Sequence, residues 1–79
     1  MNREKLLAKA RNNPRGLRFT ELCQLAEAYG FRFIRQTGSH RHFGREGVPR
    51  LVTLSPDQNR MAKSYQVRDV IDIIDQYGE

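Results

Sequence analysis

The segment from residue 30 to residue 43 restricts the fold more than any other part of the chain. Between residues 31 and 36, two phenylalanines alternate with Arg32 and Ile34, a spacing typical of a β-strand. Residues 37–39, Thr-Gly-Ser, favour a tight turn, and residues 40–43 have the length and composition of a returning strand. The sequence therefore predicts an antiparallel hairpin.

Apolar residues at helical spacing predict three helices, over residues 3–11, 21–29 and 65–77. Asn, Thr and Ser side chains are favoured at helix starts, and Gly just beyond helix ends. The expected N-caps are Asn2, Thr20 and Ser64, and the expected stops are Gly30 and Gly78.

A further β-branched segment, residues 50–54, predicts a third strand after the hairpin. The order is then helix, helix, three-stranded antiparallel meander, helix. A sheet this small is covered on one face, so we expect the helices on that face and an open face opposite. The expected class is α+β, an α-β-β-β-α arrangement with an extra N-terminal helix, as in double-stranded-RNA-binding domains. The 79 residues predict one domain, 1–79, in which residues 1–18 form an N-terminal extension or short helix.

Strand alternation decides which way the histidines point. His40 and His42 fall on one face of the second strand, and Phe43 falls on the other. If Phe43 turns inward to join Phe31 and Phe33, both histidines face the open side. Arg41 shares the face of Phe43 on this pattern.

The chain carries 14 Lys and Arg against nine Asp and Glu, a net charge of +5. Three arginines, at positions 32, 35 and 41, surround the histidines. A histidine exchanges protons near neutral pH, and arginines stabilise charge on phosphate. This combination is typical of RNA cleavage through the ribose 2′-hydroxyl, with Gly38 and Ser39 presenting a backbone N–H and a hydroxyl to phosphate. A solvated basic surface without special function is the alternative.

Other chemistry has weaker support in the sequence. His40 and His42 could share a metal ion, but the sequence offers few further ligands near them, so we expect neither a metal nor another cofactor. Cys23 lies among apolar helix positions and is interpreted as a small core residue. A single cysteine, with no apolar run long enough to cross a membrane, predicts a cytoplasmic protein without a membrane partner.

At these residues the sequence resembles the HicA family of type II toxin–antitoxin systems, also called YcfA-like proteins. The family pattern of Gly-Phe, an arginine, and then Gly-Ser-His is present as Gly30-Phe31, Arg35 and Gly38-Ser39-His40. Residues 41–43 look like the family's second strand, and residues 63–70 resemble the start of its last helix. The similarity spans residues 19–77, and the extension before it is longer than in a minimal member.

This resemblance implies a ribosome-independent, metal-independent mRNA endoribonuclease that is inhibited by a HicB-type antitoxin. It implies that His40 is the catalytic histidine, positioned by Gly38 and Ser39, and that Arg35 or Arg41 contacts phosphate. His42, on the same face, is expected to bind RNA. Two alternatives remain open from the sequence: a non-catalytic RNA-binding module, and a small interaction protein whose basic face docks an acidic partner.

Overall fold

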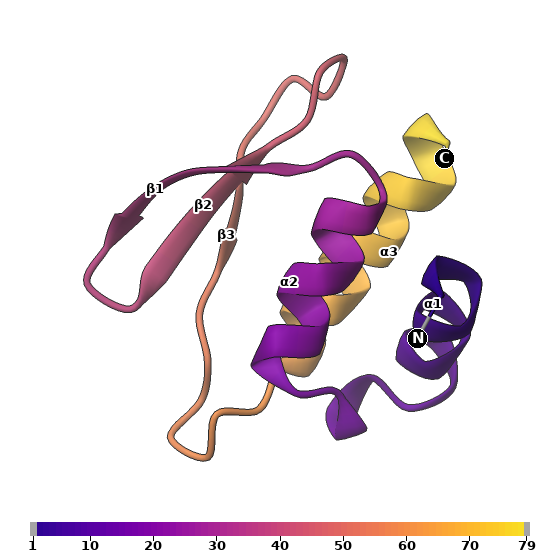
Figure 1. Ribbon diagram of the computed structural model, residues 1–79, viewed down its shortest axis with the longest axis vertical. Coiled ribbons are helices and arrows are strands. Elements are labelled where there is room, and N and C mark those ends of the chain that lie inside the picture. Colours follow the sequence, from indigo (N-terminus) through magenta and orange to yellow (C-terminus); the bar gives the residue numbers. More distant parts are fainter. Residues whose placement is uncertain (1, 79) are drawn as a thin grey trace.

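The computed structural model describes residues 2–78 of the protein, and within them the expected α+β class is confirmed (Figure 1). The strands form an antiparallel meander in the order β1-β2-β3. The elements are α1 (Arg3–Asn12), the 3₁₀ helix η1 (Pro14–Gly16), α2 (Phe19–Ala28), β1 (Arg32–Thr37), β2 (His40–Gly44), β3 (Val52–Leu54) and α3 (Ser64–Tyr77).

The helices α2 and α3 lie side by side against one face of the sheet, as expected (Figure 1). Helix α1 packs on their far side and is separated from the sheet by them. Its apolar stripe, Leu6, Leu7 and Ala10, is buried in this contact. Helix α1 is therefore packed into the fold. Within residues 2–78, no helix combines the length and the apolar character needed to cross a membrane.

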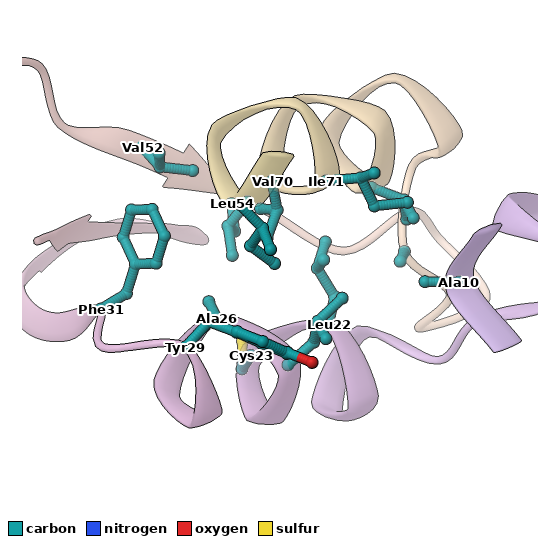
Figure 2. Close-up of a cluster of buried hydrophobic side chains, with 14 of the residues drawn as sticks. Ala10, Leu22, Cys23, Ala26, Tyr29, Phe31, Val52, Leu54, Val70 and Ile71 are labelled. Atoms are coloured by element: carbon teal, nitrogen blue, oxygen red, sulfur yellow. The ribbon is translucent and has the colours of Figure 1, made fainter. Parts of the chain in front are cut away.

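The core lies between the sheet and the helices, as Figure 2 shows. Leu22 and Ala26 of α2 meet Val70 of α3, and Val52 and Leu54 of β3 close the core from the sheet. Each fully buried Val or Leu side chain contributes about 1.5–3 kcal/mol relative to its exposed state. Cys23 is buried among these residues, which confirms its interpretation as a core residue.

One of the three expected N-caps is confirmed. The side-chain oxygen of Asn2 accepts a hydrogen bond from the Lys5 N–H at 2.8 Å. Thr20 and Ser64 were wrong as caps, because α2 begins at Phe19 and Ser64 is itself the first residue of α3. At the start of α2 the Glu21 carboxylate accepts the N–H of the N-cap residue Arg18 at 2.9 Å, and no side-chain hydroxyl caps the helix.

The expected helix stops are confirmed. Gly30, two residues beyond the end of α2, has φ of +95°, and Gly78, directly after α3, has φ of +83°. These left-handed conformations favour glycine and turn the chain out of each helix.

The inward position expected for Phe33 was wrong, because its side chain is 52% exposed, whereas Phe31 and Phe43 are buried as expected. Phe33 is on β1, an edge strand. Its ring meets the edge of the Phe43 ring at a centroid distance of 6.0 Å. The third strand is also shorter than expected and begins at Val52.

Candidate functional site

The open face of the sheet carries both histidines. Phe43 is buried toward the helices, so alternation along β2 directs His40 and His42 to the opposite side. Residues directly opposite each other in a ladder share a face. His42 pairs with Arg35 on β1 and with Thr53 on β3, so Arg35 and Thr53 lie on the same surface as His40 and His42, which we call the histidine face.

A β-bulge in β1 directs Arg35 to the histidine face. Phe33 pairs with Phe43 and Arg35 pairs with His42, so Ile34 is an extra residue between the two pairs. Without the bulge, strict alternation would place Phe33 and Arg35 on the same side. The extra residue shifts the alternation, and Arg35 lies with the histidines while Phe33 does not.

The tip of the hairpin is a two-residue turn formed by Gly38 and Ser39, between the paired residues Thr37 and His40. Gly38 has φ of +59° and Ser39 has a negative φ, the pattern of a type II′ turn, in which glycine is favoured at the first position. The Gln36 side chain donates a hydrogen bond to the Gly38 carbonyl at 2.8 Å and braces the turn. Gly38 thus fixes the direction in which His40 leaves the turn.

The two imidazoles are held differently. The His42 ring is half-buried, and its Nδ1 lies 2.9 Å from the Thr53 hydroxyl oxygen. The His40 ring is exposed and makes no hydrogen bond to any residue from 2 to 78. His40 is therefore open to a substrate, and His42 presents one ring nitrogen in a fixed orientation.

Arg41 lies on the reverse side of the hairpin, the face expected from alternation. Its guanidinium carbon is 5.2 Å from the centre of the Phe19 ring, and its Nη1 is 4.0 Å from the Cys23 sulfur. Burial raises the pKa of the Cys23 thiol, which Arg41 only partly offsets. Cys23 is thus held as an uncharged thiol, and Arg41 is separated from the other arginines around the histidines.

Three cations of α1, Arg3, Lys9 and Arg11, contact the neighbouring helices or the residue after α2. Lys9 pairs with Glu21 at 2.7 Å, and Arg11 forms a two-pronged pair with Asp75. The guanidinium of Arg3 lies 4.8 Å from the centre of the Tyr29 ring. These cations hold α1 to α2 and α3.

Metal-binding side chains do not gather around the histidines. Across the part of the chain that the structure describes, no group of three or more His, Cys, Asp and Glu side chains is arranged to hold a metal ion. The face instead offers imidazole, guanidinium and hydroxyl groups to a ligand, a set that suits an anionic, hydrogen-bonding partner.

Two features of the histidine face were missed from the sequence. Thr53 could have been found, because Val52 and Leu54 are apolar and alternation then directs the residue between them outward. The bulge at Ile34 carries no comparable signal, since neither Gly nor Pro marks the position.

The fold and the hairpin define a small α+β protein with a basic, histidine-bearing sheet face. A family model described as the HicA toxin of bacterial toxin-antitoxin systems matches residues 19–77, from the start of α2 to the end of α3. The chain therefore belongs to the HicA toxin family. Comparisons with curated proteins and with solved structures gave no match.

Proposed function

We propose that this HicA-family chain is a ribosome-independent endoribonuclease that cleaves mRNA in the cytoplasm, with residues 1–79 acting as one domain. The observation that carries the proposal is the position of His40. It is exposed, follows the glycine turn directly, and shares a face with Arg35 and His42. A proton-exchanging group beside cations is what cleavage of a phosphodiester by its own 2′-hydroxyl requires.

In the proposed reaction, the His40 imidazole accepts the proton of the ribose 2′-hydroxyl. The 2′-oxygen forms a bond to the adjacent phosphorus while the bond from phosphorus to the 5′-oxygen breaks. The leaving oxygen takes a proton from water, so the products are a 2′,3′-cyclic phosphate and a 5′-hydroxyl. The substrate supplies its own nucleophile, and no metal or cofactor takes part in this scheme.

The neighbouring groups have binding roles in this proposal. Arg35 contacts the phosphate and stabilises the charge that grows on its oxygens. The Gly38–Ser39 turn supplies a backbone N–H and a hydroxyl, and His42 donates or accepts one hydrogen bond through its free nitrogen. Arg41, on the reverse side of the hairpin, serves a different part of the RNA.

The partner that inhibits the toxin is proposed to be an antitoxin of the HicB type that covers the histidine face. Ile34 and Leu51 are exposed there, at 49% and 43%, and both reach toward Gly44. Exposed apolar side chains beside arginines suit a protein partner that has an apolar patch with an acidic rim.

A non-catalytic RNA-binding module is the alternative, and one observation favours it. Among residues 2–78, no side chain orients the His40 ring through a hydrogen bond, whereas Thr53 orients His42. A free ring suits a residue that only binds RNA, whereas a catalytic base with this geometry would gain its orienting hydrogen bond only in the complex with substrate.

Growth of a bacterial host tests the proposal directly. The wild-type chain and the His40→Ala variant are induced in parallel, with and without a co-expressed HicB-type antitoxin, and total mRNA is run on a gel. We expect growth arrest and mRNA loss with the wild type alone, prevented by the antitoxin. Arrest without mRNA loss, or arrest by both folded proteins, would contradict the nuclease.

A further inference from the structure

A groove lies on the reverse side of the hairpin, opposite the histidine face. It has a volume of about 250 Å³, below the roughly 300–1,000 Å³ of sites for drug-sized ligands. Its size suits one planar group rather than an extended ligand. The lining residues are Phe19, Thr20, Gln36, Ser39, Arg41, Pro56 and Arg60, from α2, the hairpin and the loop before α3.

The groove carries positive charge and no carboxylate. Arg41 and Arg60 line it, and within residues 2–78 neither guanidinium forms an ion pair. Asp57, the acidic residue nearest to Arg60 in sequence, is not a lining residue, and its side chain accepts the N–H groups of Asn59 and Met61 at 2.8 and 2.9 Å. The two guanidinium groups outweigh this single negative charge, so the groove attracts an anion.

The Arg41 guanidinium lies against an aromatic ring at the groove wall. Its central carbon lies over the Phe19 ring, and the residue is half-buried. A guanidinium plane supported in this way is a surface on which nucleobases stack. The amide of Gln36, on the same side of the hairpin, supplies a carbonyl oxygen that can accept from a base edge.

Arg60 is the one residue among 2–78 other than glycine that has a positive φ, at +63°. Its backbone is fixed on both sides, since its N–H donates to the Asp57 carbonyl and its own carbonyl accepts the Phe19 N–H, both at 3.1 Å. Glycine or asparagine would adopt this conformation at lower cost. The presence of arginine at a position that favours glycine points to a use for its side chain at the groove.

The groove and the candidate catalytic residue are adjacent. Ser39 lines the groove and His40 follows it, directed to the opposite face. A single strand of RNA that passes over the hairpin tip can therefore place one phosphate at His40 and the neighbouring nucleotide in the groove.

We propose that this groove binds one nucleobase of single-stranded RNA, stacked on Arg41, next to the bond cleaved at His40. Arg60 contacts the phosphate on the far side of that base. The substrate is then single-stranded, because a base held in a duplex cannot enter the groove. This inference rests on the proposed nuclease function and adds to it a subsite and a substrate class.

The test uses the full chain with His40→Ala, which keeps RNA intact, and a short single-stranded RNA. The fluorescent base 2-aminopurine is placed at each position of the RNA in turn. Two substitutions are added separately. Arg41→Lys keeps the positive charge but removes the planar guanidinium group. Arg60→Gly removes the side chain at a position where the backbone favours glycine. Arg68→Ala, an exposed cation of α3, is the matched control.

We expect 2-aminopurine fluorescence to change at one position on binding, because the base leaves the stack of its neighbours, and Arg41→Lys to abolish that change. Both groove variants should raise the dissociation constant for RNA about fivefold or more, and Arg68→Ala should not. Equal affinities of the groove and control variants, with cleavage by the wild type intact, would overturn the subsite alone. If the groove variants bind the antitoxin more weakly but bind RNA as the control does, the groove belongs to the protein partner, and the RNA subsite is also overturned. Absence of both cleavage and RNA binding would overturn the nuclease and the subsite together.

Discussion

Arg35 lies directly across from His42 in the β1-β2 ladder, one residue beyond the bulge at Ile34. The bulge matters because it changes which face Arg35 occupies. In a regular strand, Phe33 and Arg35 would lie on the same side of the sheet. In the observed register Arg35 lies on the face of His40 and His42, where the proposed nuclease binds the phosphate of RNA.

Replacing Arg35 with Met should impair RNA binding with little effect on folding, because the side chain is exposed. Loss of one charged hydrogen bond to phosphate should lower kcat/KM about tenfold or more. The slope of log affinity against log salt for single-stranded RNA should flatten by about 0.7, the value for one phosphate contact. Lys5→Met, which removes an exposed cation of α1, should leave the slope unchanged, and an equal effect of both variants would contradict the role of Arg35.

Replacing Thr53 with Val should weaken the site through His42. The Thr53 hydroxyl lies 2.9 Å from Nδ1 of His42, and valine keeps the shape while removing that hydrogen bond. The hydrogen bond that orients His42 contributes about 1 kcal/mol, and its loss corresponds to about fivefold weaker RNA binding. Isothermal titration with RNA measures this effect. If Thr53→Val loses affinity even when His42 is already Ala, the hydroxyl acts without the histidine.

Gly44 is confined by two side chains of the histidine face. A Cβ at this position would lie 2.7 Å from Cδ1 of Ile34 and 3.2 Å from Cδ2 of Leu51. Gly44→Ala should therefore force these two side-chain ends to shift, and because both side chains are exposed and can change rotamer, the loss of stability should be about 1 kcal/mol or less. Ile34→Ala should relieve part of that loss, which a double-mutant cycle by urea unfolding would detect. Additive effects of the two substitutions would show that a methyl group at position 44 does not contact the Ile34 side chain.

Acid should loosen the attachment of α1 to α2 through Glu21. The hydrogen bond from Lys9, followed by that from the Arg18 N–H, holds the pKa of the Glu21 carboxyl below its ordinary value. A carboxyl with a lowered folded pKa adds stability above its unfolded pKa of about 4.3, and this stability is lost as pH falls through the folded value.

Glu21→Gln should therefore cost about 1 kcal/mol at neutral pH and make the loss of stability below pH of about 4.3 shallower. Thermal unfolding across this pH range tests both effects. Glu27→Gln, an exposed position on the same helix, is the control and should keep the wild-type pH profile. A Glu21→Gln profile parallel to that of the wild type would contradict the linkage.

The sequence predicted most of the fold because its signals are local. The stripe of α3 and the glycines after α2 and α3 mark the helices, and Gly38 marks the hairpin turn. The exposure of Phe33 could not be predicted, since it depends on which helix covers the edge of the sheet. The start of α2 was also missed, because it depends on the Glu21 side chain, which reaches back to the Arg18 N–H, and not on Thr20.

The candidate site was predicted in part. Alternation was enough to place His40 and His42 together and Arg41 opposite them. It could not show that Arg35 lies with the histidines, because a bulge is set by the register between two strands. The groove at Arg41 was also beyond the sequence, since it joins Phe19, Pro56 and Arg60 from three separate segments.

In the proposed mechanism His40 performs proton transfer in RNA cleavage. The most direct test incubates purified wild type and His40→Ala with an end-labelled mRNA fragment in the presence of a chelator, and measures cleavage and RNA affinity in the same buffer. We expect cleavage by the wild type to 2′,3′-cyclic phosphate ends. We also expect a loss of about 10²–10⁴ in rate for His40→Ala, with affinity nearly unchanged. Cleavage at the wild-type rate by His40→Ala, or loss of cleavage only in proportion to lost binding, would show that His40 is not the proton-transfer group.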